Sequence, residues 1–134
     1  DALKIAYPHE DAIYKIIQKT ANVSRVSDRY HGRKAYSILY KAKFKNIQLE
    51  SFLIDTGYKD IDERYALFYS TFIWRKNYFK NQLDRAGTPE EIDRALNEYN
   101  EVVQLLDTIE DLFSDNSFYF GYYVTIAIGQ KKVF

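Results

Sequence analysis

The stretch Gly87-Thr88-Pro89-Glu90-Glu91 contains the signals for the end of one helix and the start of another. Gly87 suits the left-handed position that follows a helix, because it has no Cβ atom. Thr88 can cap the next helix, Pro89 fits its first turn, and Glu91 completes a capping box. These five residues therefore predict two antiparallel helices joined by a short turn.

Apolar side chains recur every three or four residues on both sides of this turn, which is the period of an amphipathic helix. Upstream, the acidic run that begins at Asp60 repeats the signal for a helix start and predicts a helix over 61–86. Its apolar stripe consists of Tyr65, Phe68, Phe72, Phe79 and Leu83. Downstream we predict a helix over 89–113. Its stripe consists of Ile92, Leu96, Tyr99, Val103, Leu106, Ile109 and Phe113.

The C-terminal segment is typical of a strand. Residues 117–128 are rich in Phe, Tyr, Val, Thr and Ile, so they predict a strand. A strand needs partners, and alternation of apolar and polar residues predicts strands over 35–45 and 47–55, with a turn at Lys45-Asn46. A helix over 34–55 is the competing interpretation, and it leaves Phe44 on the wrong side.

The elements combine into one domain over 1–134. A further helix over 8–21 begins at Pro8, which suits a first helical turn. The predicted order is α-β-β-α-α-β, an α+β fold in which a small antiparallel sheet packs against a long helical hairpin. An all-α bundle is the alternative.

Composition excludes several classes of protein. The 134 residues include no cysteine, which rules out disulfides, thiolate zinc sites and cysteine nucleophiles. No apolar run is long enough to predict a transmembrane segment. The chain begins at Asp1 without an initiator methionine, and we expect an exported protein, periplasmic or extracellular, slightly more than a cytoplasmic one.

Sequence motifs give no support for catalysis. The chain has two histidines, and His9 with Glu10 and Asp11 would fan around one helical turn rather than converge on a metal. The five glycines form no phosphate-binding loop, and no nucleophile motif is present. We therefore expect a protein that is not an enzyme and has no cofactor or metal.

Charge is segregated along the chain although the net charge is zero. Residues 12–45 carry nine basic side chains and one acid, a net of +8, whereas residues 88–116 carry nine acids and one arginine, a net of −8. Such separation can steer a partner or promote self-association. Neutrality therefore does not exclude anionic ligands.

We accordingly expect a protein–protein interaction or structural module, with another protein or a second copy of the chain as partner. Aromatic and basic residues dominate binding hot spots, and the candidate contacts are Trp74, Arg75, Lys76 and Tyr78. The alternative is a module that binds anionic ligands or nucleic acid, less favoured because no recognition motif accompanies the basic segment. Its candidates are Arg25, Arg29, His31, Arg33, Lys34, Lys41, Lys43 and Lys45.

Overall fold

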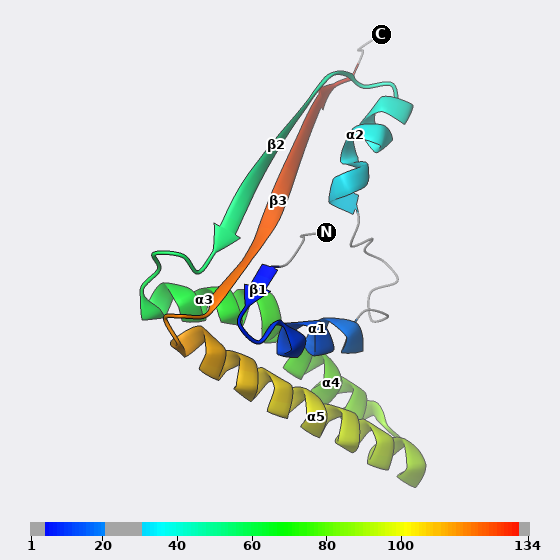
Figure 1. Cartoon of the computed structure of the whole chain (residues 1–134). Coiled ribbons are helices and arrows are strands. Elements are labelled where there is room, and N and C mark those ends of the chain that lie inside the picture. Colours follow the sequence, from blue (N-terminus) through cyan, green and yellow to red (C-terminus); the bar gives the residue numbers. More distant parts are fainter. Residues whose placement is uncertain (1–4, 21–30, 132–134) are drawn as a thin grey trace.

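The computed structural model describes residues 5–20 and 31–131, which form a helical layer and a long β-ribbon that projects from it (Figure 1). Side chains are not described at 5 and 31–33. The elements in chain order are β1 (Ile5–Tyr7), α1 (Glu10–Lys19), α2 (His31–Lys41), β2 (Lys45–Asp55), α3 (Ile61–Phe72), α4 (Trp74–Arg85), α5 (Pro89–Ser114) and β3 (Tyr119–Gln130).

The sheet is antiparallel with strand order β1-β3-β2. β3 pairs with β2 over most of its length, from Lys45 opposite Gln130 to Asp55 opposite Gly121. β1 pairs with β3 only at its start, where Tyr7 lies opposite Tyr119 and Ile5 opposite Gly121. The predicted α+β class and antiparallel sheet are thus confirmed, and the all-α alternative is wrong.

The helical hairpin forms as predicted, with α5 packed antiparallel to α3 and α4 (Figure 1). The predicted capping box is present, since the Thr88 hydroxyl accepts from the Glu91 N–H at 3.2 Å. The predicted cap at Asp60 also forms a capping box, in which the Asp60 carboxylate accepts from the Glu63 N–H at 2.9 Å. The predicted helix 61–86 is divided at Ile73, which keeps helical backbone angles. Helix 8–21 is shorter than predicted and spans Glu10–Lys19.

Gly87 does not occupy the left-handed position that the sequence suggested. The structure has no glycine with positive φ among the described residues, and Ala86 leaves α4 in an extended conformation. Instead, the Gly87 N–H donates to the Glu91 carboxylate at 3.0 Å, so the next helix satisfies this donor.

The predicted strand 35–45 is wrong, because this segment forms α2 and a turn. The helix ends where Lys43 adopts a φ of 66°, while the N–H groups of Lys43 and Phe44 donate to the carbonyls of Tyr40 and Leu39, each at 3.0 Å. This pair of bonds is a Schellman motif, which needs one left-handed residue. Two of the alternating apolar residues, Tyr36 and Tyr40, lie about one helical turn apart on the same face of α2, and their rings stack with centroids 6.2 Å apart.

The expected turn at Lys45-Asn46 is also wrong. β2 already begins at Lys45, and the register shifts between Lys45 and Gln48, with Asn46 at a φ of 50°. The irregularity is a bulge rather than a hairpin turn. The third strand of the sheet comes from β1, whose three residues are too few to give a pattern.

The core is an aromatic cluster where β3 meets the helical layer. Its rings pack 5.3 to 6.0 Å apart between centroids, and none of its members is more than 1% exposed. They are Phe68, Phe72, Phe113, Phe118 and Phe120. Burial of several phenylalanines at native density makes this cluster the main source of stability.

Candidate functional site

The β2–β3 ribbon extends beyond the helical layer as two strands alone (Figure 1). β2 is an edge strand, and no described strand pairs with the second edge of β3 after Gly121. Two-stranded ribbons are marginally stable in water unless other elements pack on them. The environment of each face therefore decides what this ribbon can do.

One face of the ribbon continues the core. Residues directly opposite each other in the register share a face, and Phe52 opposite Val124 lies on the same side as Phe120. Phe120 is fully buried against Phe72 and Phe113. We call the exposed apolar residues farther along this side the ribbon core face; they are Phe52, Ile54, Val124, Ile126 and Ile128.

The ribbon core face is open to solvent. Its five side chains are 37% to 61% exposed, the lowest at Val124 and the highest at Ile128. Glu50, opposite Ile126, is the charged residue among them. Apolar side chains scattered singly on a surface are ordinary, but a contiguous set is typical of a binding site.

The other face of the ribbon is partly covered by α2. Thr125, Ala127 and Gly129 alternate along this face and are each half-buried. A Cβ atom at Gly129 would lie 3.0 Å from the Cβ of Phe44, so glycine allows the turn after α2 to approach the strand. The two faces thus differ in their cover. α2 packs on part of one face, where Leu49, Leu53 and Tyr123 are still 45% to 46% exposed, and no helix within the described residues packs on the far end of the other.

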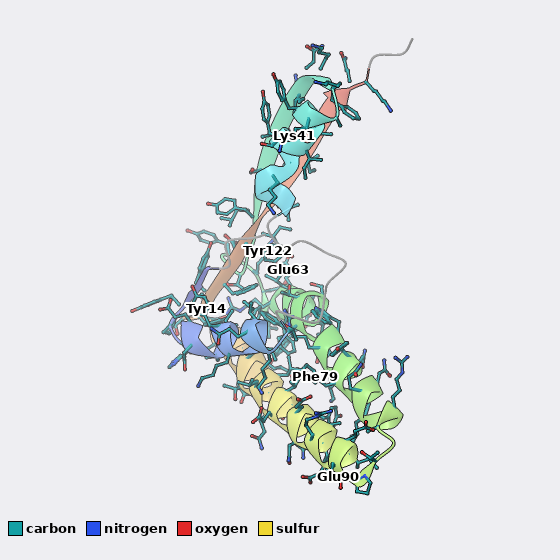
Figure 2. The ribbon with its side chains drawn as sticks, turned by 90° about the vertical axis from the view of Figure 1, so that its right-hand side faces the viewer. Tyr14, Lys41, Glu63, Phe79, Glu90 and Tyr122 are labelled. Carbon is teal, nitrogen blue, oxygen red and sulfur yellow. The ribbon has the colours of Figure 1, made fainter. Side chains whose placement is uncertain are left out.

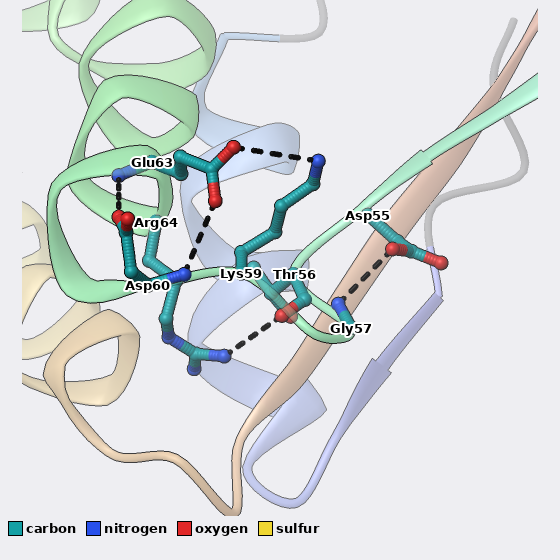
Figure 3. Close-up of polar contacts among 7 residues, drawn as sticks. All are labelled: Asp55, Thr56, Gly57, Lys59, Asp60, Glu63 and Arg64. Carbon is teal, nitrogen blue, oxygen red and sulfur yellow. Dashed lines mark hydrogen bonds and ion pairs between the residues drawn. The ribbon is translucent and has the colours of Figure 1, made fainter.

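Arg64 joins the base of the ribbon to the helical layer (Figure 3). This buried side chain donates to four carbonyl oxygens: Nε to Phe113 at 2.7 Å, Nη1 to Thr56 at 3.1 Å, and Nη2 to Asp115 at 2.6 Å and Phe118 at 2.8 Å. Burial lowers the pKa of its guanidinium, while the charge of Asp115 raises it. The carbonyls come from the end of β2, the end of α5 and the start of β3.

A second polar contact fixes the same junction. The Asp55 carboxylate accepts from the Tyr119 hydroxyl at 2.8 Å. It also accepts from the Gly57 N–H at 3.0 Å (Figure 3). The hydrogen bond to Asp55 raises the pKa of the Tyr119 phenol. Gly121 leaves room for this pair, since a Cβ atom there would lie 3.0 Å from that of Asp55.

The predicted partner contacts on α4 lie in different environments. Trp74 is 40% exposed and Lys76 is exposed, but Arg75 is 2% exposed and Tyr78 is half-buried. Arg75 lies 4.5 Å from the centroid of the Trp74 ring and donates to the Thr20 hydroxyl at 3.0 Å. Arg75 therefore packs inside the protein, whereas the sequence suggested that it lies on an exposed contact surface.

The predicted basic candidates divide between described and undescribed parts of the chain. Arg25 and Arg29 lie outside the described residues, and the side chains of His31 and Arg33 are not described. The others are exposed and lie on α2, its turn and the start of β2; they are Lys34, Lys41, Lys43 and Lys45. Because 35–41 is helical, Lys41, Lys43 and Lys45 do not align on one face of a strand, and they follow the end of α2, its turn and the start of β2 instead.

A groove of about 500 Å³ lies between the ends of α4 and α5. Its charged lining mixes basic residues such as Arg85 and Arg94 with Glu91 and Glu98. Glu91 is already engaged in the capping box, and no group of three potential metal ligands occurs within 5–20 and 31–131. The groove therefore has no constellation that indicates catalysis.

No helix in the described part of the chain is both long and apolar enough to cross a membrane. No family model, curated protein or solved structure matches the chain. The sequence did not predict the ribbon core face, because a sheet that packs on helices is expected to bury these apolar residues. Only the projection of the ribbon past the helices exposes them.

Proposed function

We propose that this protein is a protein–protein interaction module whose contact surface is the ribbon core face. The observation that supports the proposal is the exposure of five apolar side chains on a side that is continuous with the buried core. Interfaces of this kind bury an apolar centre within a polar rim. Charged groups at the tip, including Lys43 and Lys45, supply such a rim.

Rigid attachment of the ribbon also supports this role. Arg64 and the Asp55–Tyr119 hydrogen bond hold its base, and α2 packs on the opposite face. A surface that is already in place binds without a large cost of ordering. The sequence placed the contact surface on α4, and we propose the ribbon core face in its place.

Photo-crosslinking tests the proposal. A photoreactive residue replaces Ile126 on the ribbon core face or, as a matched control, Leu49 on the opposite face of the ribbon, and both positions are 46% exposed. We expect adducts with protein from position 126 and none from position 49, both with purified chain and in extract of the source cell. An adduct counts only if Phe52→Lys abolishes it. Equal labelling from both positions, or no specific adduct, would contradict the proposal.

Binding of an anionic ligand or nucleic acid at the ribbon tip is the second candidate. Residues 31–49 contain no acidic side chain, and Lys34, Lys41, Lys43 and Lys45 are exposed there. Retention on heparin that falls with salt, and falls again in Lys43→Ala with Lys45→Ala, would support it. Elution of the wild-type protein without retention at low salt would exclude it.

A further inference from the structure

Charge is distributed along the long axis of the molecule. Figure 2 places Lys41 at the ribbon end and Glu90 at the far end of the helical layer. The tip has exposed lysines and no acid within 31–49 or 125–131, whereas α5 carries eight carboxylates and one arginine. Two copies in opposite directions therefore bring unlike charges together, and two copies side by side in the same direction bring like charges together.

Symmetry selects the same arrangement. A two-fold axis makes each copy use the same patch, so two ribbon core faces can cover each other at once. Sheets pack face to face about 10 Å apart, with the side chains of the inner faces interdigitating. When the ribbons run in opposite directions, the basic tip of each copy reaches the acidic helical layer of the other.

We infer that the occupant of the ribbon core face is a second copy of this chain, packed face to face as an antiparallel two-fold dimer. This inference rests on the proposed function and specifies its partner. In the dimer, Phe52, Val124 and Ile126 form the buried centre, and the lysines of the tip pair with carboxylates of the helical layer. Their exposure of 37% to 48% in the single chain is then surface that the second copy covers.

Sedimentation equilibrium of the full chain, from low micromolar to submillimolar concentration, tests the inference. We expect a monomer–dimer equilibrium. Ile126→Lys should raise the dissociation constant at least about tenfold, because a long charged side chain replaces an apolar one at the centre of the interface in both copies. Leu49→Lys is the matched control: Leu49 is also 46% exposed but lies on the opposite face, and the variant should dimerise normally.

Folding of each variant is checked by circular dichroism. Ile126→Thr, which keeps the β-branched shape, should weaken the dimer in the same direction if the lysine variant does not fold. A monomer at all concentrations, or equal weakening by Ile126→Lys and Leu49→Lys, would overturn the inference. If the protein is monomeric but position 126 still crosslinks specifically to another protein, the proposed function stands and only the identity of the partner is wrong.

Carbodiimide coupling of a mixture of ¹⁵N-labelled and unlabelled chain tests the orientation. We expect mixed-isotope peptides that join Lys43 or Lys45 to a carboxylate of α3 or α5. Dimerisation should also weaken with added salt, because the pairs at the rim are screened. Mixed-isotope coupling confined to other carboxylates, or a dimer that tightens with salt, would overturn the antiparallel arrangement.

Discussion

The helical layer and the ribbon share β3, yet they bury their apolar residues to very different degrees. Phe113 and Phe120 are fully buried where β3 meets the helices, whereas Ile126 and Ile128 on the same side of the molecule are 46% and 61% exposed. The amino-acid types are alike in the two regions. The two regions differ in whether helices of the chain pack on the sheet. The apolar character of the residues alone therefore does not show where the core ends.

This difference has an energetic consequence. Burial of apolar surface contributes roughly 25 cal/mol per Å², and the helical layer obtains most of that gain. The ribbon depends on its hydrogen-bonded ladder, on α2, and on the junction at Arg64 and Asp55. Substitutions should therefore destabilise the monomer strongly in the helical layer and weakly on the ribbon core face.

Truncation of one phenylalanine in each region gives the largest contrast. We expect Phe113→Ala to lower the free energy of unfolding by about 3–5 kcal/mol, because it leaves a cavity in the aromatic cluster. Phe52→Ala, at a site 48% exposed, should cost less than about 1 kcal/mol in dilute monomer. Urea unfolding at low protein concentration measures both, and equal costs would show that the ribbon core face is buried within one chain.

Loss of Arg64 should have the next largest effect. Arg64→Ala removes hydrogen bonds to four carbonyl oxygens, and we expect a cost of about 3 kcal/mol. Arg64→Lys retains the charge but cannot reach acceptors in several directions, so it should recover only part of the loss. Urea unfolding compares the two variants. If Arg64→Ala were tolerated within measurement error, Arg64 would not be the residue that holds the ribbon to the helical layer.

Removal of the helix cap should have a smaller effect that is confined to the helical layer. Thr88→Ala deletes the hydroxyl that accepts from Glu91 and should cost about 1 kcal/mol. Ser114→Ala, at the other end of α5, removes a hydroxyl that only donates to a carbonyl on its own helix, and should be nearly neutral. Thermal unfolding distinguishes them, and equal shifts in Tm would be inconsistent with the capping box.

Acid should produce the smallest effect. Hydrogen bonds from the Gly87 and Thr88 N–H groups lower the pKa of Glu91, and hydrogen bonds from Ser117 lower the pKa of Asp115. A carboxylate with a lowered pKa stabilises the fold above its unfolded pKa, and that contribution is lost as the pH falls through the folded pKa. The urea midpoint should therefore fall on acidification below about pH 4.5, less steeply in Glu91→Gln. An identical pH dependence in that variant would contradict the assignment.

The sequence predicted those parts of the fold that local signals determine. Thr88 and Asp60 cap helices because a short side chain satisfies free N–H groups wherever a helix begins. The prediction of a strand over 35–45 was wrong because a helix and a strand both explained the apolar residues of this segment. In addition, amino-acid composition does not indicate the left-handed conformation of Lys43, which ends α2.

The candidate site was harder to predict. Phe52 and Ile126 were recognised as strand residues, but their exposure depends on where the helical layer stops along the ribbon. That boundary is a property of the tertiary arrangement. The prediction of an exposed contact at Arg75 differs from the structure for the same reason. An arginine beside a tryptophan suggests a surface contact, but packing against α1 buries Arg75, which donates to Thr20.

Amide hydrogen exchange of the wild-type chain at two protein concentrations tests most directly whether a second copy covers the ribbon core face. Peptides from 122–130 should exchange more slowly at high concentration, and peptides from 102–113 in α5 should exchange at the same rate at both. Exchange over 122–130 that does not depend on concentration would contradict the dimer.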